Sequence, residues 1–245
     1  MSRIVHVLIA LAVIAVPVIG WFAGGWSSAT TLAVYWFETV ASCLLVSVRA
    51  LMHQHWTPRR GHFRYEAAAE TSRRGPKRSS FVGWFTLISV SFCAVHAVFL
   101  GIVLLLLHQN KQSALVDIDW RSVGFGCLTV LVFLLVDITV DLFSLRRWSF
   151  WRLERLANRG LSRVVVVHLT LIFGLVAIAL TDAPASFFGV FVVLKTLAAL
   201  SFVVPQYEPS VAPAWLGERF KNYWSEDRGD EIARRERNER PWRTS

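Results

Sequence analysis

The chain has 245 residues, of which 54% are hydrophobic and 18% charged, and its mean hydropathy is +0.46. A soluble domain carries about 25% charged residues. Here apolar runs of membrane-spanning length alternate with short stretches that hold nearly all the charge, which excludes a soluble enzyme, a disulfide-stapled secreted domain and a disordered chain. The net charge of +9 lies between the apolar runs, so it indicates membrane orientation rather than nucleic-acid binding.

Six apolar stretches are long enough to cross about 30 Å of hydrocarbon as helices, which takes roughly 20 residues each. They cover residues 4–22, 28–52, 81–107, 122–144, 162–181 and 185–204. The predicted fold class is therefore all-α, an integral membrane bundle of six transmembrane helices. The length of the first stretch favours a retained anchor over a cleaved signal peptide.

The bundle is expected to occupy residues 1–205, followed by a tail at 206–245. In the tail, Leu216, Phe220 and Trp224 recur at helical spacing and predict a short amphipathic helix. The residues beyond it mix acidic and basic side chains without apolar periodicity, so we expect a disordered polyampholyte there.

The distribution of positive charge predicts the topology. Most of the 26 Lys and Arg residues lie in the 53–80 segment, the 145–163 segment and the tail. Segments rich in Lys and Arg stay in the cytoplasm. We therefore expect a multi-pass plasma-membrane protein with both termini cytoplasmic.

The predicted cytoplasmic segments suggest lipid partners. The 145–160 segment mixes Trp148, Phe150 and Trp151 with arginines, which is typical of the headgroup level and of binding to anionic lipids. His53 and His62 lack Cys or carboxylate neighbours at metal-ligand spacing, so we expect them in a solvated loop. The expected partners are the bilayer and anionic lipids, with no nucleic acid.

Ionisable residues inside the predicted spans are the strongest functional signal. Each such group costs a few kcal/mol in hydrocarbon and requires a partner. With a rise of 1.5 Å per residue, Glu38, His96, His168 and Lys195 lie within about 5 Å of the membrane midplane, and Asp137 lies about 6 Å toward the cytoplasm. Four groups at one depth on four helices predict a shared site.

Three further ionisable residues lie nearer the predicted cytoplasmic ends. His6 begins the first span, Arg49 lies near the inner end of the second, and Asp141 follows Asp137 by one turn. At this level a side chain reaches the interface easily, so we expect His6 to extend toward water.

Several motifs resemble a known family. Tyr35-Trp36-x-Glu38 in YWFETV, Arg163…His168…Gly174 in RVVVVHLTLIFG, and Lys195-Thr196 in VLKT are similar to a prokaryotic multi-spanning membrane family known as the domain of unknown function 6498. The resemblance covers roughly residues 28–204. Two features depart from the family pattern: Thr39 stands where Asn is expected, and the segment after the fourth span is Arg-rich. The resemblance implies a fold and key positions but no reaction.

The residue types of the midplane group favour an intramembrane metal-dependent enzyme. Glu38, His96 and His168 are ligand types for Zn²⁺ or Fe²⁺, and Asp137 is a candidate fourth ligand or supporting catalytic residue. Lys195 would then stabilise an anionic intermediate on a lipid-like substrate. No HExxH or HxxxH pair places two ligands on one helix, which weighs against this hypothesis.

Two alternatives remain open. Carboxylates and histidines between the midplane and the cytoplasm also suit proton relay in a transporter or channel. Alternatively, a buried salt bridge between Glu38 and Lys195 pins the helix register, and the function lies in partner binding.

Overall fold

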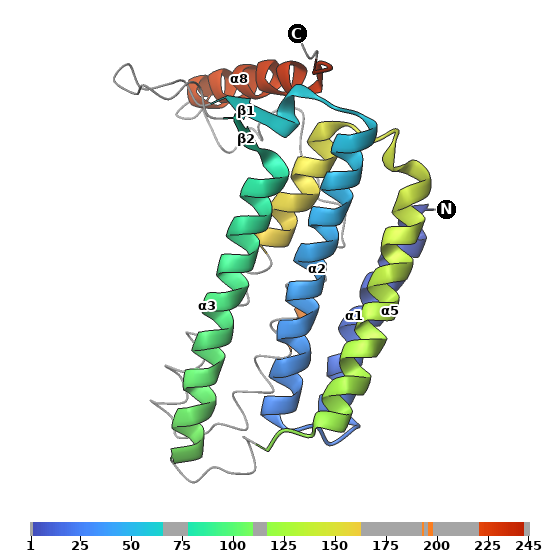
Figure 1. Cartoon of the computed structure of the whole chain (residues 1–245), viewed down its shortest axis with the longest axis vertical. Helices are drawn as coiled ribbons and strands as arrows, with labels where there is room; N and C mark the ends of the chain where they lie inside the picture. The colour runs from blue at the N-terminus through green and yellow to red at the C-terminus, as the bar shows by residue number, and fades with distance from the viewer. Residues whose placement is uncertain are drawn as a thin grey trace.

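The computed structural model describes residues 2–65, 78–109, 117–162, 193, 196, 197 and 221–242. Its long helices are α1 (Ser2–Phe22), α2 (Ser28–Trp56), α3 (Phe81–Gln109), α5 (Trp120–Leu145) and α8 (Lys221–Glu239), and residues 150–162 are also helical. A short 3₁₀ helix, η1 (Arg60–His62), leads into β1 (Phe63–Tyr65), which pairs antiparallel with β2 (Arg78–Ser80). Apart from this ladder, the described residues form the helical architecture that the sequence predicts (Figure 1).

Four of these helices, α1, α2, α3 and α5, are long and apolar enough to cross a membrane. They confirm helices at the first four predicted positions. Nearly all of the fifth and sixth predicted spans, 162–181 and 185–204, lies outside the described residues. Exposed side chains such as Phe125, Leu87 and Phe143 line the outer faces, with Phe143 87% exposed. So much exposed apolar surface is typical of contact with lipid rather than water.

Helix α2 is the centre of the described bundle and packs against α1, α3 and α5. The chain reverses between α1 and α2 in a short turn where Gly25 has a positive φ of 65°. Ser27 caps α2, because its hydroxyl accepts a hydrogen bond from the Thr30 amide at 3.1 Å. Successive helices therefore run in opposite directions (Figure 1).

Small residues allow close packing beside the turn. A Cβ atom at Gly20 would lie 2.3 Å from the Trp26 ring, and one at Gly126 would lie 2.7 Å from it. The indole therefore occupies space that only glycine leaves free on α1 and α5. On the other side of α2, Trp36 donates to the Cys93 carbonyl on α3 at 3.0 Å.

The end of the bundle at which α2 ends and α3 begins carries a polar cap, which comprises residues 53–65, 78–80, 146–154 and α8. Figure 1 shows α8 lying across this end. The helix differs from the disordered polyampholyte expected for this part of the tail. Its contacts with the rest of the cap explain the difference: Arg235 lies 4.1 Å above the Trp151 ring and Arg234 lies 3.8 Å from Glu154.

The 145–160 segment is more buried than the sequence predicts. Phe150, Leu153 and Ala157 are fully or almost fully buried, in one cluster with Val46 of α2 and Phe85 of α3. An apolar face at helical spacing therefore belongs to the bundle core rather than to the headgroup level.

Candidate functional site

Four ionisable side chains from three helices form one group, here called the charged cluster. His6 comes from α1, Arg49 from α2, and Asp137 and Asp141 from α5. The two aspartates share a face of α5 because they are four residues apart. Asp141 lies about 6 Å along the axis from the end of α5, so the cluster is near the polar cap.

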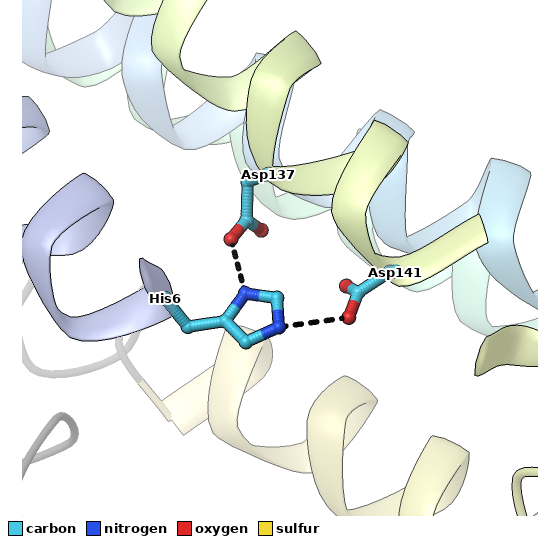
Figure 2. A group of neighbouring side chains, drawn as sticks. All are labelled: His6, Asp137 and Asp141. Atoms are coloured by element: carbon cyan, nitrogen blue, oxygen red, sulfur yellow. Dashed lines mark hydrogen bonds and ion pairs between the residues drawn. The ribbon is translucent and has the colours of Figure 1, made fainter. Parts of the chain in front are cut away.

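The His6 ring lies between the two aspartates (Figure 2). Its Nδ1 is 2.7 Å from an oxygen of Asp137, and its Nε2 is 3.2 Å from an oxygen of Asp141. Each ring nitrogen therefore faces a different carboxylate.

Arg49 contacts the other oxygen of each aspartate. Its Nη2 donates to Asp137 at 2.6 Å, and its Nε lies 2.8 Å from Asp141. The second contact is an ion pair rather than a hydrogen bond, because Nε makes no hydrogen bond of acceptable geometry. Each carboxylate thus lies between a guanidinium group and an imidazole ring.

Burial divides the charged cluster into two halves. The side chains of Arg49 and Asp141 are only 5% and 6% exposed, whereas those of His6 and Asp137 are 28% and 26% exposed. The arginine and one aspartate are therefore sealed inside the bundle, while the histidine and the other aspartate are accessible at its surface.

The charge balance of this cluster depends on one proton. Two carboxylates and one guanidinium sum to −1, since arginine stays protonated in proteins. The ring is hydrogen-bonded to Asp137 through Nδ1 and lies at ion-pair distance from Asp141 through Nε2, and an imidazolium is the form that presents a proton to each carboxylate. An imidazolium at this position would bring the sum to zero.

The same histidine and aspartates are a candidate metal site. Among the described residues, His6, Asp137 and Asp141 form the group of potential ligands whose atoms lie within 4.8 Å of one another. One ion binds one nitrogen of an imidazole, but here the two nitrogens face different carboxylates (Figure 2). Arg49 already contacts both aspartates, so the geometry fits a proton better than a metal ion.

The midplane residues singled out by the sequence are only partly described. Glu38 and His96 are buried, at 4% and 7% exposure. The Tyr35 side chain lies near the Thr196 side chain and the Glu38 carboxylate. His168 and Lys195 lie outside the described residues.

Asp137 lies with His6 and Arg49, at a different level from Glu38. Eleven residues separate Glu38 from Arg49 on α2, about 16 Å along the helix axis. Asp137 therefore lies toward the polar end of the bundle, as expected, but its contacts with His6 and Arg49 were not predicted from the sequence. The missed signal is the pairing of Asp137 and Asp141 at one-turn spacing with an arginine inside a neighbouring apolar helix.

The polar cap contains a second polar group, here called the histidine pair. His53 and His62 are fully buried, so the expectation of a solvated loop is wrong. His53 Nδ1 lies 2.8 Å from His62 Nε2, and His53 Nε2 lies 3.0 Å from the Trp148 carbonyl oxygen. If His53 donates to that carbonyl, its Nδ1 accepts a hydrogen bond from His62, which makes both rings neutral.

Aromatic side chains enclose the histidine pair. The His62 ring lies edge-on to Phe150 at 4.8 Å between centroids and to Phe81 at 6.4 Å. Burial, together with the nearby His53 ring and the Arg59 guanidinium, lowers the pKa of His62 to about 3. The polar cap is therefore built around uncharged imidazoles.

Comparison with known proteins gives one match. The sequence profile of a family of unknown function (DUF6498) matches residues 1–214. No curated protein and no solved structure matches the chain. The match includes the whole charged cluster and ends before α8.

Proposed function

We propose that this chain, which belongs to the DUF6498 family of unknown function, is a proton-coupled membrane transporter. The observation that supports the proposal is the position of the His6 ring between two aspartates that share one guanidinium. With His6 neutral the charged cluster has a charge of −1, and one added proton removes it. Intramembrane groups of this kind commonly serve proton relay.

The proton acts on the contact between α1 and α5. His6 is the member of the charged cluster that α1 contributes: its Nδ1 is hydrogen-bonded to Asp137, and its Nε2 lies at ion-pair distance from Asp141. When the ring loses a proton, both contacts lose the attraction of its positive charge and the two carboxylates repel each other more strongly. The exposed half of the cluster, His6 and Asp137, exchanges the proton with its surroundings. Arg49 and Asp141 remain an ion pair in the buried half. Proton release therefore loosens α1 from α5.

The proposal has a direct spectroscopic test in nanodiscs. Nitrogen-15 NMR of histidine-labelled protein, with His6→Gln to assign the signal, reports the protonation of the ring. We expect both His6 nitrogens to carry protons at neutral pH. A singly protonated ring would contradict the charge balance on which the proposal rests.

Coupling to conformation needs a second measurement. Spin labels at Leu11→Cys on α1 and Leu128→Cys on α5 occupy exposed positions, in a chain whose native cysteines are replaced by Ala. We expect the distance between them to change with pH in the otherwise native chain and to stay constant with His6→Gln. A distance between the labels that does not change with pH in either chain would overturn the transport proposal.

A metal-dependent enzyme acting on a lipid-like substrate is the second candidate. The observation that favours it is the burial of Glu38 and His96. In addition, Thr196, which follows Lys195 in the sequence, lies beside Tyr35, on the same face of α2 as Glu38. Metal analysis of detergent-purified protein beside His96→Ala tests it. A stoichiometric zinc or iron ion that disappears in the variant supports this candidate, and its absence from the wild type removes it.

We also propose that the polar cap is cytoplasmic and binds anionic lipid headgroups of the plasma membrane. Arg146 lies 4.9 Å above the Trp56 ring, and Arg152 lies 3.9 Å above Trp148, so cations and indoles combine at one end of the bundle. A cysteine at Asn110 should react with an impermeant reagent from outside the cell, and one at Ser79 should not. The reverse pattern would invert the topology.

A further inference from the structure

Residues Glu239–Trp242, here called the tail segment, lie in extended contact with the polar cap. The Arg60 amide donates to the Arg240 carbonyl at 2.9 Å, and the Trp242 amide donates to the Pro58 carbonyl at 3.0 Å. Between them, Arg59 and Pro241 form an antiparallel bridge. This is the hydrogen-bond pattern by which an extended peptide adds to a free backbone edge.

The Glu239 side chain adds a charged contact at a helix end. Its Oε1 accepts a hydrogen bond from the Trp151 amide at 2.9 Å, in the first turn of the 150–162 helix. A carboxylate is stabilised at a helix N-terminus because the first amides point toward it. Its Oε2 lies 3.4 Å from Arg59, and Arg59 also donates to the Glu239 carbonyl at 2.6 Å.

The last side chain of the tail segment makes an aromatic contact. The Trp242 and Phe63 rings lie 5.1 Å apart between centroids. The tail segment thus combines a carboxylate at a helix N-terminus, backbone pairing and an aromatic anchor within four residues. Such a combination recognises sequence as well as backbone.

The surface that receives the tail segment is held by the bundle itself. His62 and His53 bind each other and the Trp148 carbonyl, and Phe150 packs so closely on Gly61 that a Cβ there would lie 2.3 Å from its ring. This receiving surface lies inside residues 1–214 that match the family, whereas the tail segment lies beyond them. The site is therefore part of the family body, and a separate extension fills it.

We propose that the polar cap carries a peptide-docking site for a Glu-x-Pro-Trp sequence, occupied in the same chain by the tail segment. The site consists of the 58–60 backbone edge, Arg59, the Trp151 amide and the Phe63 ring. This inference is independent of proton transport, since none of its contacts involves the charged cluster.

Peptide binding to the full chain tests the proposal. The double variant Glu239→Ala with Trp242→Ala empties the site, and a fluorescein-labelled peptide with the sequence of residues 235–245 is the probe. We expect saturable binding to the double variant and at least about tenfold weaker binding to the wild type, whose own tail segment competes. A peptide with Ala in place of the glutamate that corresponds to Glu239 should bind at least about tenfold more weakly, given the strength of hydrogen bonds to charged groups.

The matched control is Glu236→Ala, an exposed change on the same helix that should leave the site occupied and behave as wild type. Equal binding to all three chains, or none to a folded double variant, would overturn the proposal. Concentration-dependent dimers of the wild type held by the tail would overturn its occupation within one chain. If the double variant does not fold, hydrogen exchange on Glu239→Gln decides: about tenfold faster exchange at Arg60 and Trp151 supports the site, and unchanged rates reject it.

Discussion

The charged cluster and the histidine pair show how partners decide the state of one residue type. His6 lies between two carboxylates, whereas His62 lies among aromatic rings and beside another imidazole, which lower its pKa. Both groups are anchored on α2, by Arg49 and by His53 one turn later. The lesson is that neighbouring turns of one helix can anchor a charged environment for one histidine and an aromatic environment for another, because different elements pack against them.

The largest effect should follow from removing the cation of the charged cluster. Arg49→Met leaves two aspartates with one imidazolium, and losing one partner of a buried ion pair costs about 3–5 kcal/mol. The free energy of unfolding in detergent measures this loss. Arg49→Met combined with Asp141→Asn should recover part of it, and a single variant as stable as the wild type would show that the cluster adds no stability.

The two aspartates should differ in the same assay. Asp141→Asn should destabilise the protein by about 2–3 kcal/mol, because its sealed carboxylate loses charged partners. Asp137→Asn should cost only about 1 kcal/mol, because Asp137 is 26% exposed and solvent screens its contacts. Equal losses would contradict the division into a sealed and an accessible half.

The histidine pair should make stability depend on pH in the acidic range. The pKa of His62 is lowered to about 3, against roughly 6.5 for an unfolded histidine, so the unfolded chain binds more protons between these values. The stabilisation is complete above about pH 6.5 and is lost as pH falls toward 3. Between pH 7.5 and 5 we expect a loss of about 2 kcal/mol.

His62→Phe is the control for this dependence. It should flatten the pH profile over that range, since the remaining titrating groups are shared with the wild type. Parallel profiles for the two chains would show that folding does not lower the pKa of His62.

The smallest effect should come from a neutral contact outside both groups. The Thr86 hydroxyl donates to the Ser47 hydroxyl at 2.9 Å, between α3 and α2. Thr86→Val removes this hydrogen bond and should cost about 0.5–1 kcal/mol, with no pH dependence. A larger or pH-dependent loss would mean that the α2–α3 contact is coupled to one of the ionisable groups.

The sequence predicts the elements of the fold better than it predicts the pairs of side chains. Apolar length alone locates four helices within a few residues of their observed ends. The depth of a residue along its helix axis can also be predicted from the sequence, and it correctly places Asp141 near the polar end. The rotation of a helix about its axis cannot be predicted in this way. His6 was therefore expected to extend toward water, although α5 turns two carboxylates toward it.

The burial of His53 and His62 could not be predicted for a related reason. Their surroundings come from Phe81 and Phe150, which belong to other elements and approach only when α3 and the 150–162 helix pack on α2. The polar, basic sequence around the two histidines does not predict these contacts. The same holds for α8, where Arg234 and Glu239 find their partners on the assembled bundle.

The spacing of the charged cluster along the chain has a consequence for biogenesis. Asp137 follows His6 by 131 residues and Arg49 by 88 residues. Both basic side chains therefore leave the ribosome long before the carboxylates that neutralise them. Because His6 and Arg49 lie toward the ends of their helices, we expect them to reach for the headgroup level until α5 is inserted. We therefore expect the first two helices to reach their final positions only after the synthesis of the fourth span.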